Sequence, residues 1–300
     1  MIVVAGETLV DLIVRADVLE PVLGGAPSNT AVAVARLGAA VGFAGAISTD
    51  RFGDQLLQRL RAADVDTSRV VRTDLPTSLA MADIDDRGTA TYRFYFDGTS
   101  VPQLDRVEVG DAAALVTGGL GLVLEPMAGA IEGAIADATI PVVVDVNARP
   151  AIIGDLAAYR TRLDRVVART SVLKVSDEDL EVIEPGEDPD GVARRLVDAG
   201  AGVVIVTRGA AYTSIVTADD RVDVPVPALP VDHPVVDTIG AGDTFGAGLV
   251  TSLVESGALA TSASIPGDAL VAAVELGHAA AAVTVTRRGA DPPTRAELNI

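Results

Sequence analysis

The chain has 300 residues, 49% of them hydrophobic, and a formal net charge of −19 at pH 7. It is long and apolar enough to bury a large core, whereas its spread acidic residues would repel a nucleic-acid backbone or an anionic membrane surface. The chain has no cysteine, which excludes disulfides and thiolate metal sites, and its first strand-like run lacks a basic leader, so we expect a cytoplasmic protein that binds a small molecule.

Short β-branched runs alternate with helical patterns along most of the chain. In chain order the expected strands are IVVAG (2–6), VGFAGAI (41–47), GLVLE (121–125), PVVVDV (141–146), SVLKVS (171–176) and GVVIVT (202–207). The expected helices are 28–39, 50–65, 125–138, 155–168 and 188–201. Such alternation is typical of right-handed βαβ units, and continuously apolar strands are typical of a sheet covered on both faces. We therefore predict an α/β fold with a doubly wound, mostly parallel sheet flanked by helices.

One region departs from this rhythm. Residues 77–100, TSLAMADIDDRGTATYRFYFDGTS, read as two alternating strands joined by the turn-forming residues DDRG. We interpret 1–300 as one domain that carries a small β lid, formed mainly by about 12–23 and 77–101. Because a lid with an exposed face is often paired with a second copy, we expect a homodimer through the lid.

The segment DTIGAGDTFGAG, residues 237–248, is a glycine-rich turn that enters an apolar helical pattern. Its backbone N–H groups at Gly240, Ala241 and Gly242 can converge on a phosphate, with the helix dipole adding to the attraction. A bound phosphate would repel the carboxylate of Asp243 in the first turn if this residue served only for binding. Its presence therefore suggests that Asp243 accepts a proton from an attacking hydroxyl. In the alternative interpretation, Asp243 caps the helix and the glycines permit close packing.

The same segment resembles the D-T-x-G-A-G-D motif of the ribokinase-like (PfkB) carbohydrate kinases. GGAPSNTAVAVARLG (24–38) is similar to the sugar-binding motif of that family, and GETLVDL (6–12), DVNARP (145–150), LKVSDEDL (173–180) and VTRGA (206–210) extend the resemblance over the chain. The resemblance implies ATP-dependent phosphorylation of a hydroxymethyl group on a sugar or nucleoside. It favours the fructokinase branch, since ribokinases usually read G-G-K-G-A-N at this chain's GGAPSN. A 2-keto-3-deoxygluconate kinase, a ribokinase and a nucleoside kinase are the alternatives.

Sugar hydroxyls need paired donors and acceptors, and the resemblance implies several residues that supply them. They are Asp11, Gly24, Gly25, Asn29, Asn147 and Arg149. Asp11 as a turn residue, Asn29 as a helix cap and Arg149 in a surface ion pair are the structural alternatives. Arg93 in the lid strand could instead meet the carboxylate of a sugar acid.

The resemblance also implies an ATP site with a hard divalent ion, Mg²⁺. Its candidate residues are Lys174, Thr207, Gly209, Thr238, Gly240, Gly242 and Ala279. The family's N-x-x-E pattern is replaced by Ser176 to Asp179, which makes Asp179 the candidate that organises the metal and leaves Glu178 as a substitute. Asp237, together with the loop 288–290, could hold a monovalent cation such as K⁺.

Two interpretations from other classes remain at this point. A non-catalytic sugar- or nucleotide-binding protein on the same fold is disfavoured by the intact Asp243. A nicotinamide-dependent oxidoreductase is disfavoured because no G-x-G-x-x-G follows the first strand.

Overall fold

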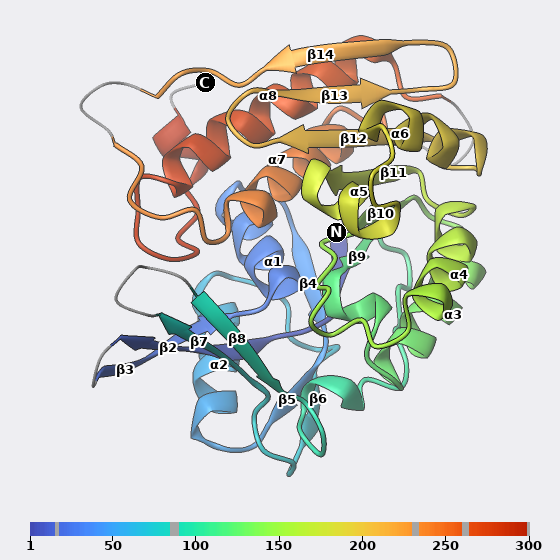
Figure 1. The fold of residues 1–300 in the computed structure, drawn as a ribbon. Coiled ribbons are helices and arrows are strands. Elements are labelled where there is room, and N and C mark those ends of the chain that lie inside the picture. The colour runs from blue at the N-terminus through green and yellow to red at the C-terminus, as the bar shows by residue number, and fades with distance from the viewer. Residues whose placement is uncertain (16–17, 85–89, 230–233, 260–263, 299–300) are drawn as a thin grey trace.

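The computed structural model describes residues 1–15, 18–84, 90–229, 234–259 and 264–298. An eight-stranded sheet occupies the centre of this part of the chain, with helices on both faces (Figure 1). In spatial order its strands are β14 (Arg221–Pro225), β13 (Tyr212–Val216), β12 (Val203–Arg208), β11 (Val172–Ser176), β10 (Val142–Asp145), β9 (Ala114–Gly118), β1 (Ile2–Ala5) and β4 (Val41–Ala44). The six strands from β12 to β4 are parallel, and β13 and β14 are antiparallel additions, which confirms the predicted mostly parallel α/β fold.

The prediction of a strand at GLVLE (121–125) is wrong. The strand is β9, just upstream, and Gly119–Leu122 forms the 3₁₀ helix η2. Gly118 and Gly119 have φ values of 153° and 54°, which turn the chain out of the sheet. The apolar residues that followed this turn looked like a strand because they are buried, and Leu120 and Leu122 belong to the core.

The predicted strand VGFAGAI divides at Gly45. Its first part is β4, and its second part, β5 (Ala46–Ser48), pairs with β6 (Val71–Thr73) in a separate two-stranded sheet. A Cβ on Gly45 would lie 2.6 Å from the carbonyl oxygen of Gly6, so this residue allows the chain to pass close to the end of β1.

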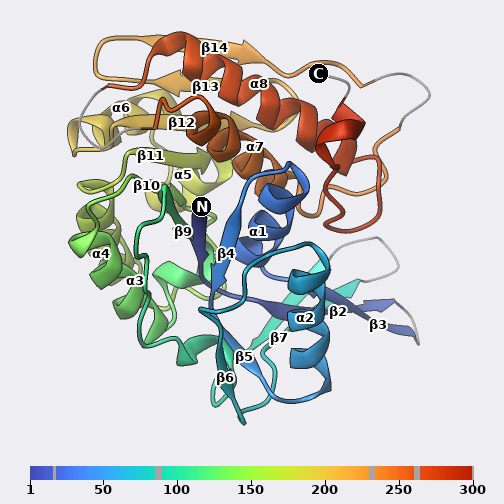
Figure 2. The same cartoon turned by 180° about the vertical axis from the view of Figure 1, so that it is seen from behind.

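Two layers of helices cover the central sheet, as the opposite views in Figures 1 and 2 show. One face shares its core with α1 (Ala26–Arg36), α2 (Arg51–Ala62), α7 (Ala241–Glu255) and α8 (Gly267–Thr284). The other face shares its core with α3 (Met127–Asp137), α4 (Leu156–Val167), α5 (Asp177–Ile183) and α6 (Pro189–Asp198). Short 3₁₀ turns, η1 (Val101–Gln103) and η3 (Arg295–Leu298), complete these elements.

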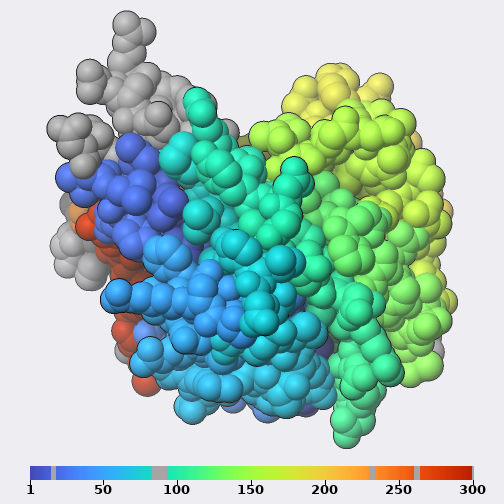
Figure 3. Space-filling view, turned by 90° about the horizontal axis from the view of Figure 1, so that it is seen from below, coloured from blue at the N-terminus to red at the C-terminus, as the bar shows by residue number. Residues whose placement is uncertain are grey.

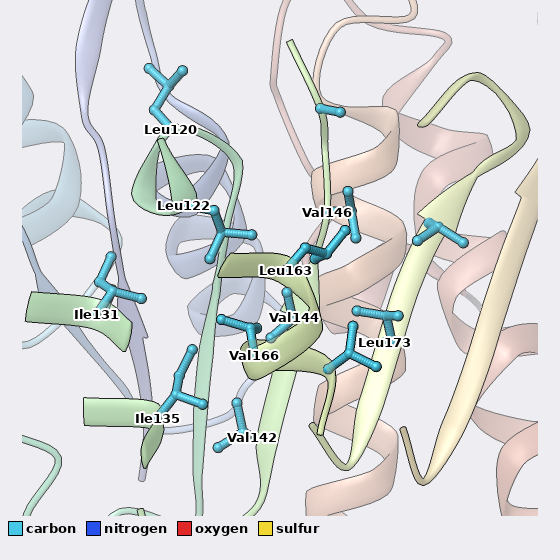
Figure 4. Close-up of a cluster of buried hydrophobic side chains, with 14 of the residues drawn as sticks. Leu120, Leu122, Ile131, Ile135, Val142, Val144, Val146, Leu163, Val166 and Leu173 are labelled. Carbon is cyan, nitrogen blue, oxygen red and sulfur yellow. The ribbon is translucent and has the colours of Figure 1, made fainter. Parts of the chain in front are cut away.

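The second layer shows why continuous apolar strands form here. Val144 of β10 and Leu173 of β11 belong to one buried cluster with Ile131 of α3 and Leu163 of α4 (Figure 4). Because the neighbouring residues of both strands face the other helix layer, these strands are apolar up to their last residue, except at Lys174 of β11. The other polar residues of these two strands, Asp145 and Ser176, stand where the strands leave the sheet.

Helices α7 and α8 pack with their backbones close together. A Cβ on Gly248 would lie 2.8 Å from the Cα of Gly277, which is closer than side chains allow. Phe245 covers the other side of Gly277. This close packing holds α7 against α8, and with it the N-terminal end of α7 that forms part of the site described below.

A four-stranded sheet forms the lid, with the order β3 (Val18–Gly24), β2 (Leu9–Arg15), β7 (Leu79–Ile84) and β8 (Ala90–Tyr95). β7 and β8 pair antiparallel, as predicted, although the DDRG turn that joins them lies outside the described residues. Seen from below, the lid residues lie beside those of α2 (Figure 3). None of the described helices is long and apolar enough to cross a membrane.

Candidate active site

The carboxyl ends of the central strands meet the lid and the N-terminal end of α7 (Figure 1). Ligands of open α/β sheets gather at this edge. The ionisable side chains that converge there, and that are linked by electrostatic effects on pKa, are Glu7, Asp11, Asp145, Arg149, Lys174 and Asp243. We call these six residues the polar cluster. A pocket beside it is lined in part by Pro27, Gly119 and Asn147.

The glycine-rich turn forms the start of α7. Gly240 has a φ of 76°, and a Cβ there would lie 2.5 Å from the Cβ of Ala290, so the turn requires glycine. The N–H of Ala241 donates to the carbonyl of Thr238 at 3.2 Å. No side chain caps this helix end, so the amides of Gly242 and Asp243 have no partner within the helix and point to where an anion would bind.

Asp243 lies in this first turn, partly buried, and is held by one hydrogen bond. The Nδ2 of Asn29 on α1 donates to the Oδ2 of Asp243 at 2.8 Å. Burial raises the pKa of Asp243 to about 6, while the bond from Asn29 opposes the rise and the charge of Asp145 adds to it. A carboxylate whose pKa lies close to neutrality is suited to accept a proton.

Asp11 of β2 faces Asp243 from the lid. A Cβ on Gly24 would lie 2.3 Å from the Oδ2 of Asp11, so only glycine leaves room for this carboxylate. Gly25 has a φ of 102° and starts α1, with its carbonyl accepting the N–H of Asn29 at 2.9 Å. Burial, followed by the charge of Asp243, raises the pKa of Asp11 to about 6.

The segment after β10 supplies the opposite side. Asn147 has a φ of 41°, a left-handed conformation that asparagine tolerates better than most residues. Arg149 donates to the carbonyl of Ala148 at 3.1 Å, and its charge lowers the pKa of Asp11 and Asp243. The chain therefore brings Asn147 and Arg149 to the same edge as Asp11 and Asn29.

Lys174 of β11 is buried and paired with Asp145 of β10. Its Nζ donates to the two carboxylate oxygens of Asp145 at 2.9 and 2.7 Å. Burial alone would lower the pKa of Lys174, but the adjacent carboxylate outweighs burial and the pKa is raised. Its Nζ lies 3.4 Å from where a Cβ on Gly242 would be, so a fixed positive charge stands beside the start of α7.

Two of the remaining residues predicted for the nucleotide lie at this edge of the sheet. Thr207 and Gly209 are at the end of β12 and just after it, and the φ of Gly209 is 52°. Ala279 is a half-buried residue of α8. Tyr212 begins β13, and its ring centroid lies 5.3 Å from the guanidinium carbon of Arg208.

The carboxylates of the two residues predicted to bind cations, Asp179 and Asp237, accept backbone hydrogen bonds. Asp179 accepts the N–H of Ala148 at 2.7 Å and that of Ser176 at 2.8 Å, which makes it part of a capping box on α5. Asp237 accepts the N–H groups of Ile239 and Gly289. Among the described residues, no group of three His, Cys, Asp or Glu side chains is arranged to hold a metal ion.

The structure does not bring Arg93 to the polar cluster. In the lid, Asp11 pairs with Ala80, which pairs with Phe94, so these three side chains share one face. Arg93 is the next residue on β8 and therefore projects from the opposite face, where it is exposed. The interpretation that Arg93 meets the substrate is corrected by this alternation.

Three residues near the site were missed by sequence reasoning. Glu7 follows β1 and is 3% exposed, and burial raises its pKa to about 8. Asp145 is the last residue of a buried strand. Because ligands gather at the carboxyl ends of such strands, its position could have identified it as a site residue. Arg59 of α2 donates to the Oδ1 of Asn29 at 2.9 Å, and nothing in its helical pattern signalled this contact.

Comparison with known proteins identifies the class. A family model described as pfkB family carbohydrate kinase matches residues 1–297, so the chain belongs to this family of carbohydrate kinases. It is 37% identical over 265 residues to a fructokinase of Rhizobium leguminosarum bv. trifolii, covering 84% of this chain and 79% of the relative.

Solved structures agree with this membership. A fructokinase from Xylella fastidiosa with bound ATP has a TM-score of 0.88 and 28% identity, covering 99% of this chain and 96% of the other. A double mutant of Vibrio cholerae fructokinase with fructose, ADP and potassium ion bound has a TM-score of 0.86 and 25% identity, with coverage of 99% and 96%.

Proposed function

We propose that this chain transfers the γ-phosphoryl group of ATP to a hydroxymethyl group of fructose, with Asp243 as the general base. The observation that carries the proposal is a carboxylate of raised pKa in the first turn of a helix whose amides are open to an anion. Relatives that are named fructokinases, one with ATP bound and one with fructose and ADP bound, support this pair of substrates.

The reaction is a single displacement. As the terminal hydroxyl oxygen of the sugar bonds to the γ-phosphorus, Asp243 takes the hydroxyl proton. The bond from the γ-phosphorus to the bridging oxygen breaks, and its electron pair leaves with ADP. The amides of Gly242 and Asp243, the positive end of the α7 dipole and the nearby charge of Lys174 stabilise the negative charge on the transferred group.

The sugar lies between two walls in this proposal. Asp11, Asn29 and the backbone at Gly24 and Gly25 offer donors and acceptors on one side, and Asn147 and Arg149 offer them on the other. Arg93 was the candidate partner for the carboxylate of a sugar acid, and it lies on the outer face of the lid, away from Asp11. An uncharged ketohexose is therefore preferred over 2-keto-3-deoxygluconate.

The nucleotide lies along Thr207, Gly209, Thr238 and Ala279 in the same proposal. Mg²⁺ would enter as part of the MgATP substrate, and Asp179, whose two oxygens each accept a backbone N–H group, would act on it through water. The potassium ion in the Vibrio cholerae structure supports a monovalent cation near Asp237, where the N–H of Gly289 ties the loop 288–290 to this carboxylate.

The lid also supports pairing of two copies. Leu19 and Tyr95 are 57% and 48% exposed, and their register places both on the outer face of the lid with Arg93. A homodimer through this face would cover them, and light scattering after size exclusion would measure its mass. Use of ATP, an intracellular metabolite, favours a cytoplasmic location.

A substrate panel with a matched pair of variants tests the function. We expect fructose to give the highest kcat/KM among fructose, ribose, adenosine, tagatose 6-phosphate and 2-keto-3-deoxygluconate, measured as ADP release with MgATP. Asp243→Asn lowers kcat about 10²- to 10⁴-fold, as the loss of a general base does. Asp268→Asn, an exposed aspartate in the first turn of α8, is the control and keeps normal turnover.

Two results would contradict parts of this proposal. If the sugar acid leads the panel, fructose is the wrong substrate. If Asp243→Asn turns over as fast as the control, Asp243 is not the base.

A further inference from the structure

A partly buried arginine on α2 stands directly behind the Asn29–Asp243 hydrogen bond. The Nη2 of Arg59 donates to the Oδ1 of Asn29 at 2.9 Å, while the Nδ2 of the same amide donates to Asp243 at 2.8 Å. Asn29 is 7% exposed and lies in the first turn of α1, so its amide has little room to rotate. Helices α2, α1 and α7 are thus joined by one line of side chains.

The chemistry of arginine decides how this amide is oriented. A guanidinium only donates hydrogen bonds, so it requires the carbonyl oxygen of Asn29 on its own side. The NH₂ group is then turned to Asp243, which as a carboxylate only accepts. If the amide were reversed, its NH₂ would face the guanidinium and its oxygen would face the carboxylate, and both contacts would be repulsive.

The same arginine reaches the turn that starts α7. Its Nη2 also donates to the carbonyl of Ala290 at 3.3 Å. Ala290 is the residue against which Gly240 packs, with no space for a Cβ between them. Arg59 therefore contacts both the residue that holds the carboxylate of Asp243 and the loop that supports the backbone of its helix.

We propose that Arg59 is a positioning residue for phosphoryl transfer, which fixes the Asn29 amide so that it donates to Asp243 and leaves the other carboxylate oxygen for the sugar hydroxyl. This inference rests on the proposed function of Asp243. It assigns to Arg59 two effects on the base: its orientation, and its readiness to be deprotonated, since the bond from Asn29 lowers the pKa of Asp243.

Other charged groups also face Asp243. They are Glu7 after β1, Asp11 on β2, Asp145 on β10, Arg149 after β10 and Lys174 on β11. An Arg59 variant leaves all of them in place. A change in the pH profile of such a variant therefore reports on Arg59 and on the amide that it holds.

The test is the pH dependence of kcat in Arg59→Met, which keeps the side-chain stem and removes the donors. We expect kcat to fall about tenfold, the size of losing one hydrogen bond to a charged group, and the acidic limb of the profile to move about one pH unit upward. The limb moves upward because a base that has lost a donor is protonated at higher pH. In an Asn29→Ala background, most of this effect disappears, since no amide remains to be held.

Two further variants keep the test decisive. Arg59→Lys, which also only donates, retains most of kcat and the normal acidic limb, even if Arg59→Met folds poorly. Arg61→Met removes an exposed arginine from the same helix, bonded to Thr67, and leaves kcat and its pH profile unchanged.

The outcomes separate this inference from the proposed function. If Asp243→Asn is inactive but a folded Arg59→Met has the normal kcat and acidic limb, Arg59 is only structural and the inference is wrong. If the effect of Arg59→Met is just as large without Asn29, it does not act through the amide, and the inference is also wrong. If Asp243→Asn is itself active, the proposed function fails first.

Discussion

Replacing Glu7 by glutamine should stabilise the protein near neutral pH. Glu7 is 3% exposed, and its Oε2 is buried without a hydrogen-bond partner among the described residues. A Cβ on Gly119 would lie 2.9 Å from the Oε1 of Glu7, so the carboxyl group is tightly enclosed. Burial raises its pKa from the ordinary 4.5 to about 8, and the charge of Asp243 adds to the rise. Glu7 is therefore mostly protonated in the folded state at pH 7.

The cost of this protonation follows from the two pKa values. Above pH 4.5 the unfolded chain ionises Glu7 while the folded chain keeps its proton, so stability falls as pH rises until the pKa of the folded state, about 8, is passed. Each pH unit in this interval costs about 1.4 kcal/mol, so that the cost at pH 7 is at most about 3.5 kcal/mol. Glutamine has the same shape and no proton to lose, and we expect Glu7→Gln to recover about 1–3 kcal/mol at pH 7.

The assay is urea unfolding of both proteins at several pH values between 5 and 8. Asp11 and Asp243 have pKa values of about 6, so the interval from pH 6 to 8 reports mainly on Glu7. The difference in free energy of unfolding between Glu7→Gln and the wild type should grow with pH across this interval. Glu275→Gln, which changes an exposed residue of α8, should show no such growth. A constant or negative difference would mean that Glu7 is ionised in the fold, and the reasoning would be refuted.

Three further predictions concern the site and its support. Because Asp243 must be deprotonated to act as a base, kcat/KM should decline as pH falls through about 6, and a flat profile down to pH 5 would contradict its role. Gly242→Val places a side chain between the open amides and Lys174, so turnover and ATP affinity should both fall at least about tenfold in steady-state kinetics; unchanged values would mean that the glycine serves packing alone. Gly248→Ala should lower the melting temperature because its Cβ meets Gly277, whereas Gly246→Ala, in open space on the same helix, should be neutral or stabilising.

Two parts of the site could be predicted from the sequence because each is formed by residues that are close together in the chain. Gly240 precedes the helix that carries Asp243 in its first turn, so the sequence indicated a glycine-rich turn, open amides and a carboxylate together. Gly25 and Asn29 are related in the same way at the start of α1. In both cases the local backbone follows from a few consecutive residues.

The errors arose where one sequence pattern is compatible with more than one structure. GLVLE and β9 are both short apolar runs, and only the positive φ values of Gly118 and Gly119 decide which of them continues the sheet. Arg93 looked like a substrate contact because a strand pattern does not say which face meets the ligand. The pairing of Asp11 with Ala80 and Phe94 decides that.

The sequence by itself determined the layered α/β fold, because continuous apolar strands alternating with amphipathic helices are buried favourably only in that arrangement. It also determined the backbone geometry at the start of α7, since that geometry is local. Only the tertiary structure decided how the carboxylates are tuned. Asn29 and Asp243 are separated by 214 residues and Arg59 and Asn29 by 30, and the hydrogen bonds that join them exist only after three helices have packed together. The raised pKa values of Glu7, Asp11 and Asp243 have the same origin, because burial depends on the whole fold and on no single motif.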